Sequence, residues 1–214
     1  MHVSHLAYLL LFISSTHGLD VSALETQQKA YPIPEHGQML LDVPRSWEVT
    51  YFLPGDNKPP VIIFFPPEKA KRDTFQLTVS FFWDDGLERN VTDPDEIKSL
   101  VESVGLKILD SSNEDELILK QIDGASGSGY FFDLSDESAA EGEFKYLTQG
   151  AIGASELLIV FSLFRNELDD VLRDATLTML RNARQRFRPD VNYLLYNNRN
   201  RQPATVLKIS QPRL

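Results

Sequence analysis

Cysteine is absent from this chain of 214 residues. Without it, the protein forms no disulfide, binds no metal through thiolates, uses no cysteine nucleophile and carries no lipid on an N-terminal cysteine. A chain of this length can still bury a core that is large enough to fold without cross-links. The absence therefore excludes several chemistries and leaves an ordinary globular fold open.

Histidine is almost as scarce, with four residues, of which only His36 lies beyond the first 17 positions. A His–carboxylate–nucleophile set or a multi-histidine zinc site is therefore hard to assemble. Ser126 and Ser128 lack the Gly-x-Ser-x-Gly frame of a hydrolase nucleophile. Their glycine-rich segment, 124–129, precedes a predicted strand rather than a helix, so it indicates a hairpin turn and not a phosphate loop. We expect no catalytic residue.

Long apolar runs are also lacking, apart from the eight residues Leu6–Ile13. This run is too short for a hydrocarbon core that needs about 20 residues, and it is followed by small and polar residues up to Ala23. We predict a signal peptide over 1–23, cleaved after Gly18 or Ala23, and an exported protein, periplasmic or secreted, without a transmembrane segment. Because Lys and Arg are missing before the run, a buried N-terminal helix is the alternative.

Basic side chains are few except near the C-terminus, and the net charge is −10. Residues 181–214 hold eight Lys or Arg and one acid, whereas the preceding 180 residues hold 13 basic and 30 acidic side chains. This asymmetry predicts that the tail binds an anionic partner or folds back onto its own acidic body. Nucleic acid is disfavoured as a partner because the body is acidic. The candidate partner-binding residues are Arg184, Arg186, Arg188, Arg199 and Arg201.

Two acidic turns, 84–95 and 133–143, are the candidates for a cation site, since carboxylate oxygens bind hard cations such as Ca²⁺. Their spacing matches no EF-hand loop, and Asp93 and Glu96 have a simpler role as helix caps. We therefore assign no metal-binding or cofactor-binding residue.

Alternating apolar residues predict strands over 47–53 and 75–83, and a short continuous apolar run predicts one over 61–65. Further strands are expected over 38–43 and 117–122, followed by three more within 127–166. Two segments show helical spacing. The first has Asp93 as N-cap, Pro94 at the first helical position and an expected end at Gly105. Its apolar stripe comprises Ile97, Leu100, Val101 and Val104.

The second helix is expected to follow an Asn166 cap and to stop before Pro189. Its apolar stripe comprises Leu168, Val171, Leu172, Ala175, Met179 and Ala183. Together these patterns predict an α+β protein, with an antiparallel sheet flanked by helices in an α/β/α sandwich. The expected divisions are a flexible lead-in at 24–37, the α+β domain at 38–188, and a basic, loop-rich tail at 189–214 with an edge strand at 204–209.

Several short motifs resemble those of the PsbP-like fold, particularly small exported bacterial proteins of the DcrB type. They are Pro44-Arg45-Ser46-Trp47, 127–132, 146–150, 157–164 and the helix from Glu167, within a resemblance that covers 38–187. The resemblance implies an antiparallel sheet between helices and a role in docking rather than turnover. This chain departs from DcrB-type lipoproteins because it lacks the lipid-bearing cysteine, and the resemblance does not account for its basic tail.

The working hypothesis is a non-catalytic exported module that docks onto a protein assembly or an envelope component. A protein that binds a small ligand or a cation through the acidic turns is the alternative. A hydrolase of unknown substrate is the third hypothesis.

Overall fold

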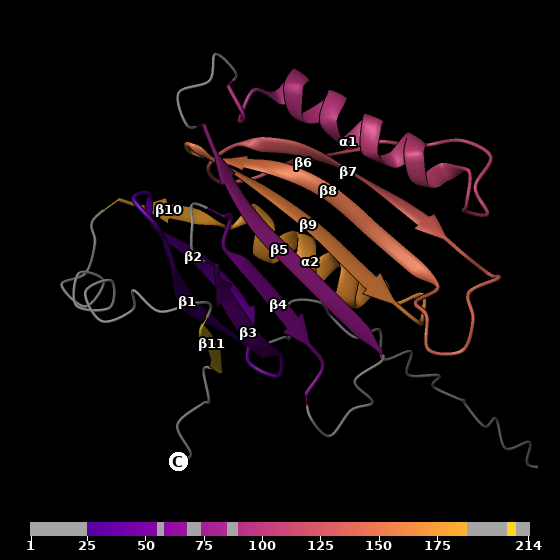
Figure 1. Ribbon diagram of the computed structural model, residues 1–214, viewed down its shortest axis with the longest axis horizontal. Helices are drawn as coiled ribbons and strands as arrows, with labels where there is room; N and C mark the ends of the chain where they lie inside the picture. The colour runs from indigo at the N-terminus through magenta and orange to yellow at the C-terminus, as the bar shows by residue number, and fades with distance from the viewer. Residues whose placement is uncertain (1–24, 55–57, 68–73, 85–89, 188–204, 209–214) are drawn as a thin grey trace, which may run out of the picture.

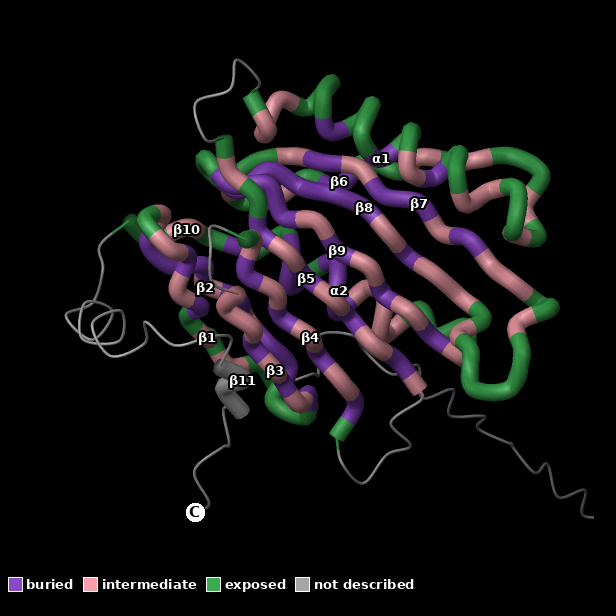
Figure 2. Tube along the Cα trace, viewed as in Figure 1, coloured by how far each residue is buried: buried purple, intermediate pink, exposed green. Residues whose placement is uncertain are grey.

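Many of the strands alternate between buried and more exposed residues along their length (Figure 2). The computed structural model describes residues 25–54, 58–67, 74–84, 90–187 and, for the backbone alone, 205–208. In chain order the elements are β1 (Thr26–Ile33), β2 (Gly37–Pro44), β3 (Glu48–Leu53), β4 (Val61–Phe65), β5 (Phe75–Trp83), α1 (Pro94–Leu109), β6 (Lys120–Asp123), β7 (Ser128–Ser135), β8 (Tyr146–Ala154), β9 (Leu157–Arg165), α2 (Asp170–Arg181), β10 (Arg184–Arg186) and β11 (Thr205–Lys208).

The strands form two antiparallel sheets. The larger has the order β11-β3-β4-β5-β9-β8-β7-β6, and the smaller has the order β1-β2-β10. The three strands predicted within 127–166 are β7, β8 and β9, which pair with one another in succession. The edge strand predicted at 204–209 is also found, because β11 pairs with β3 at the margin of the larger sheet.

Helices cover opposite faces of the larger sheet, and Figure 1 shows α1 on one side with α2 behind the strands. One face carries Ile62, Leu77 and Phe161, which pack with α2 and with the smaller sheet in one buried cluster. The other face carries Phe132 and Leu158, which pack against α1. The predicted α+β fold with a sheet between two helices is therefore confirmed. Among the described helices, neither is long and apolar enough to span a membrane.

Helix α1 begins as predicted and ends later than predicted. The Asp93 side chain caps it by accepting hydrogen bonds from the amides of Asp95 and Glu96, at 2.9 and 3.2 Å. Gly105, expected to end the helix, lies inside it and is buried. A Cβ atom at this position would lie 2.6 Å from a methyl group of Leu117. The glycine therefore allows the helix to pack closely and does not terminate it.

Helix α2 begins later and ends earlier than the sequence indicates. Its N-cap is Asp169, whose side chain accepts a hydrogen bond from the amide of Leu172, and not Asn166. Leu168, expected in the apolar stripe, precedes the helix and is 71% exposed. The chain leaves the helix at Asn182 and enters β10, so the predicted helix after 181 is wrong because these residues pair with β2 instead.

The segment predicted as a flexible lead-in contains β1, which pairs with the whole of β2. Pro32 argued against a strand, but β1 is an edge strand and an edge strand tolerates a proline. Tyr31 and Ile33 point into the core and are fully buried. Residues 34–36 form the turn into β2, with Glu35 in the left-handed region at φ 64°. The expected signal peptide at 1–23 lies outside the described residues.

Tyr31 provides a test of this packing. Its hydroxyl is buried and has no hydrogen-bond partner among the described residues, and burial raises the pKa of Tyr31 above its usual range. Tyr31→Phe should therefore leave the stability unchanged at pH 7 or raise it by about 1 kcal/mol. The wild type should lose stability as the pH rises above about 10, because the unfolded chain releases a proton that the folded chain retains.

Urea unfolding followed between pH 7 and pH 11 measures this difference. The advantage of Tyr31→Phe should grow above pH 10 and at pH 11 should exceed its value at pH 7 by about 1.4 kcal/mol. Tyr146→Phe removes a hydroxyl from a half-buried position on β8 and serves as the control. An advantage that stays constant with pH would contradict the buried, neutral hydroxyl.

Candidate functional site

Helix α1 covers only part of its face of the larger sheet. It packs on β7 and β8, whereas β9, β5 and β4 extend beyond it on the same face (Figure 1). Leu100 was expected in the buried stripe, but it is 42% exposed. That expectation is wrong, because the sheet surface below this side of the helix is open.

The uncovered margin of α1 forms an apolar groove of about 410 Å³ against the sheet. Of its lining side chains, only Gln149 is polar. Phe82 and Leu100 are 39% and 42% exposed, and they lie beside the other apolar side chains of the lining. The lining comes from β5, the segment before α1, α1, β8 and β9, as Phe82, Trp83, Val91, Leu100, Val101, Val104, Gln149, Gly150, Ala151, Leu158 and Val160.

A second hollow of about 340 Å³ adjoins the groove and shares Val91, Leu100 and Leu158 with it. Its other lining includes Asn90, Glu96, Ser99 and Ser103, so this hollow is more polar. Leu100 therefore lies at the boundary between the apolar groove and the more polar hollow.

The groove continues into an open sheet surface. On the face that α1 covers in part, Val160 of β9 pairs with Ser80 of β5, which in turn pairs with Val61 of β4. Ile63 and Phe164 lie on the same face, and all five of these side chains are partly exposed. The partly exposed surface therefore extends beyond the groove, and it is mixed, because β5 contributes the polar residues Gln76, Thr78 and Ser80 to this face.

Arg165, at the end of β9, is the most buried charged side chain among the described residues, with 2% exposure. Its guanidinium donates one hydrogen bond to the Thr148 hydroxyl and another to the backbone oxygen of Asp169, both at 3.0 Å. The Asp133 carboxylate lies 3.8 Å away, accepts a 2.5 Å bond from Thr148 and pairs with Lys120. This Arg165 cluster joins β7, β8 and β9 to the start of α2.

Burial lowers the pKa of Arg165, while the charge of Asp133 opposes that effect. The guanidinium nitrogen Nε has no partner among the described residues. The other polar atoms of the cluster are already bonded to one another, so we interpret it as a structural tie between strands rather than as a binding site.

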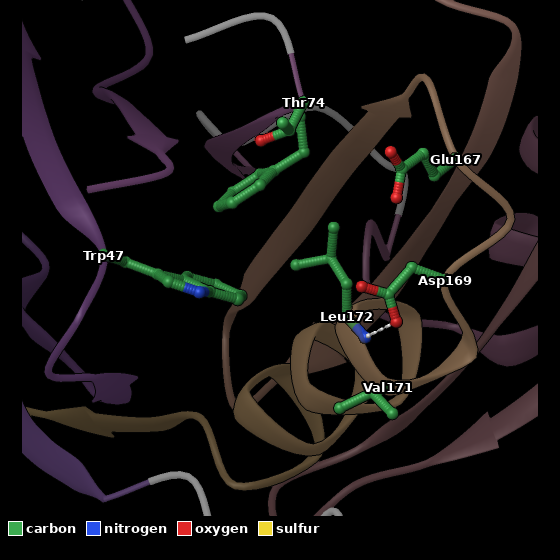
Figure 3. Close-up of a pocket in the computed structure, with 7 residues that line it drawn as sticks. Trp47, Thr74, Glu167, Asp169, Val171 and Leu172 are labelled. Carbon is green, nitrogen blue, oxygen red and sulfur yellow. Dashed lines mark hydrogen bonds between the residues drawn. The ribbon is translucent and has the colours of Figure 1, made fainter. Parts of the chain in front are cut away.

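A smaller pocket of about 240 Å³ lies at the N-terminus of α2 and is drawn in Figure 3. Its walls include Trp47, Phe75 and Leu172, and the carboxylates of Glu167 and Asp169 border it. Asp169 is engaged as the helix cap, as the dashed line in Figure 3 indicates. This volume is smaller than that of typical small-molecule sites, which is about 300 to 1,000 Å³. We therefore give this pocket less weight than the groove.

His36 is the one histidine among the described residues. Its Nδ1 lies 2.7 Å from a carboxylate oxygen of Glu156, and the same oxygen accepts a 3.0 Å bond from Gln185. Its ring also lies against Trp83, with 4.7 Å between the ring centroids. This His36 cluster connects the β1–β2 turn, the β8–β9 turn and β10.

The acidic turns do not form a cation site in the described part of the chain, where no three His, Asp or Glu side chains come together as ligands. Asp93 is used as a helix cap, and Asp133 belongs to the Arg165 cluster. Asp136 accepts bonds from the amide and hydroxyl of Ser138, and Glu143 accepts one from the amide of Ala140. Residues 85–89 of the first turn lie outside the described residues.

Of the arginines expected to bind a partner, Arg184 and Arg186 lie on β10, and neither lines the groove. Arg186 donates a 2.5 Å hydrogen bond to the side chain of Gln38 on β2. Arg188, Arg199 and Arg201 lie outside the described residues. Their role in partner binding stays a prediction.

The groove was not anticipated from the sequence. The sequence contains one local indication of the groove, at Phe82. Apolar and polar residues alternate along β5 up to Ser80, but position 82, where a polar residue would continue the pattern, holds a phenylalanine. Three-residue and four-residue spacing identified the apolar stripe of α1 but could not show how far the sheet extends beyond it.

No family model matches the sequence, and no curated protein matches it. Among solved structures, the chain is similar to the solution structure of cyanobacterial PsbP (CyanoP) from Synechocystis sp. PCC 6803. The TM-score is 0.47 and the sequence identity is 16%, over 81% of this chain and 99% of that chain. The PsbP-like resemblance and the DcrB-type assignment stay predictions. At this level the similarity describes an arrangement of strands and helices and identifies no ligand or partner.

Proposed function

We propose that this protein is a non-catalytic, exported docking module whose groove beside α1 receives apolar side chains of a partner protein. The observation that carries the proposal is the exposure of Phe82 and Leu100 at a groove whose lining has a single polar side chain. Exposed apolar surface of this kind marks interaction sites in soluble proteins.

A protein partner fits better than a small molecule because the partly exposed surface continues beyond the groove, with Phe164 on β9, Ser80 on β5 and Ile63 on β4. A small ligand would cover the groove alone. The body of the chain has an excess of acidic over basic side chains, so a partner with Lys or Arg around its apolar contact is favoured.

Two matched substitutions on α1 test the groove. Leu100→Gln changes an exposed residue of the groove, and Leu106→Gln changes a residue of the same helix that is 53% exposed and lies outside the groove. The apolar dye ANS should bind the Leu100→Gln protein about tenfold more weakly, since loss of one buried leucine contact costs about 1.5 kcal/mol. Leu106→Gln should bind the dye as the wild type does.

Crosslinking in the native host identifies the occupant. A photoreactive residue at position 100 should crosslink one discrete protein, and the same residue at position 106 should not. Equal crosslinking at both positions, or unchanged dye binding by Leu100→Gln, would refute the docking groove.

A small apolar ligand is the second candidate, because about 410 Å³ lies within the range of ligand sites. Native mass spectrometry of the protein purified from its own host distinguishes the two. A retained small molecule that is absent from Leu100→Gln would favour ligand binding over docking.

A further inference from the structure

The turn before α1 contains the sequence Asn90-Val91-Thr92. It matches the acceptor pattern for asparagine-linked glycosylation, which is Asn-x-Ser or Asn-x-Thr with any residue except proline between them. The chain contains this pattern once, so a single glycan is at issue. The pattern has a function only in an exported chain, and the inference below therefore rests on the export that is part of the proposed function. Because a three-residue pattern is common, its place in the fold decides whether it can carry a glycan.

Asn90 is exposed and occupies the first position of a turn. Its backbone oxygen accepts a 3.0 Å hydrogen bond from the amide of Asp93. Its side-chain oxygen Oδ1 accepts bonds from the amide and the hydroxyl of Thr92, at 3.2 and 2.9 Å. The nitrogen Nδ2, which is the atom that a sugar modifies, donates to no described residue. A glycan on Nδ2 therefore breaks no hydrogen bond within the described part of the chain.

The hollow of about 340 Å³ beside α1, here called the polar hollow, adjoins this nitrogen because Asn90 is part of its lining. Glu96, Ser99 and Ser103 contribute a carboxylate and two hydroxyls, and these side chains form no hydrogen bond with other described residues. The apolar part of the lining comprises Val91, Ile97, Leu100 and Leu158. An N-acetylated amino sugar carries both hydroxyls and an apolar methyl group, so it matches both kinds of lining.

We infer that Asn90 carries an asparagine-linked glycan whose first sugar occupies the polar hollow. The transfer joins Nδ2 of Asn90 to the anomeric carbon of an oligosaccharide held on a lipid pyrophosphate. The bond from that carbon to the pyrophosphate oxygen breaks, the lipid pyrophosphate leaves, and Nδ2 loses one proton to a base of the transferase. The secretory pathway supplies both the oligosaccharide donor and the transferase.

The glycan would lie beside the groove rather than inside it. Asn90 lines the polar hollow but not the groove, whereas Val91 lines both. A partner of the groove would therefore approach from the side of β5 and β9. Transfer of the glycan does not depend on partner binding, so loss of the docking groove would leave this inference standing.

Mass spectrometry of the protein purified from its own host tests the site. Treatment of the wild-type protein with peptide N-glycosidase in heavy-oxygen water should convert Asn90 to a labelled aspartate. Thr92→Ala should abolish the glycan, and Thr92→Ser should retain it because serine keeps the acceptor pattern.

A second acceptor pattern distinguishes a failed site from failed export. Asp115→Thr places a threonine two residues after Asn113, which is exposed in the segment between α1 and β6. A glycan on Asn113 of this variant, with none on Asn90, would overturn the inference and leave export intact. The absence of a glycan from both positions would also overturn it. The N-terminus of the purified protein reports export separately, since signal cleavage after Gly18 or Ala23 removes the residues before it.

Thermal unfolding tests the position of the first sugar. An endoglycosidase that leaves one sugar on Asn90 should not change the melting temperature. Complete removal should lower it by about 2 to 4 °C, as expected for the loss of one or two hydrogen bonds in a domain of this size. The Asn90→Asp variant has the same covalent structure as the fully deglycosylated chain and should melt with it.

The hydroxyls of the polar hollow provide the matching substitution. In Ser99→Ala/Ser103→Ala, complete removal of the glycan should lower the melting temperature by less than in the wild type, because two partners of the sugar are missing. A decrease that already follows removal of the outer sugars, or equal melting temperatures for all three glycan forms, would overturn the placement of the first sugar in the polar hollow.

Discussion

Gly150→Ala should destabilise the protein by about 3 kcal/mol or more, or prevent it from folding. Gly150 lies in β8 between Phe131 of β7 and Phe161 of β9. A Cβ atom there would lie 2.3 Å from the backbone oxygen of Tyr130 and 2.6 Å from the Cβ of Phe131. Because backbone cannot move aside as a flexible side chain can, β7 and β8 would have to separate. Urea unfolding followed by circular dichroism measures the loss.

Gly153→Ala is the matched control in the same strand. A Cβ atom at Gly153 would have its nearest neighbours at 3.4 Å, which is close to ordinary contact. We expect this variant to lie within about 1 kcal/mol of the wild type. Similar stabilities for the Gly150 and Gly153 variants would contradict the close approach of β7 to β8.

Arg165→Ala is expected to cost about 3 kcal/mol or more of stability. The substitution removes hydrogen bonds to Thr148 and to the backbone of Asp169 and leaves a cavity where the side chain lay. Lysine should not rescue the loss, because it cannot reproduce the planar set of donors. Thermal and urea unfolding at pH 7 measure both variants.

Arg173→Ala is the control for loss of an arginine. Arg173 lies on α2 and pairs with Asp170 and Asp174 nearer the surface, so its removal should cost less than about 1 kcal/mol. A double-mutant cycle of Arg165→Ala with Asp133→Asn should give a loss smaller than the sum of the single losses, because the two groups belong to one cluster. Additive losses would show that Arg165 acts independently of Asp133.

Much of the sheet could be predicted because its strands show either period-two alternation, as in Phe75–Trp83, or a short continuous apolar run, as in Val61–Phe65. Val61–Phe65 and Phe75–Trp83 have the predicted bounds. Strand β1 was missed because Pro32 is a signal against strands in general, and the sequence does not reveal that a strand will lie at an edge. The start of α2 was misplaced because Asn166 and Asp169 are both good N-caps, and local preference does not choose between them.

The candidate site was harder to foresee than the fold. Periodicity showed that Leu100 belongs to the apolar side of α1, but its exposure depends on how many strands extend beyond the helix. Arg165 lies in a strand whose other residues are mainly apolar, and only its partners on β7 and β8 explain its burial. Both features arise from contacts between distant segments, which a single sequence does not display.

The position of β2 has a consequence for the order in which the molecule assembles. This strand, near the beginning of the described chain, pairs with β10, and Gln38 and Arg186 are 148 positions apart. A ribosome releases β2 long before β10 exists, so the smaller sheet stays incomplete until nearly the whole body has been synthesised. Contacts between such remote segments slow folding, because the intervening chain must be ordered first. Newly made molecules should therefore expose the apolar side of β2 for longer than that of β7–β9, and chaperones have most time to act there.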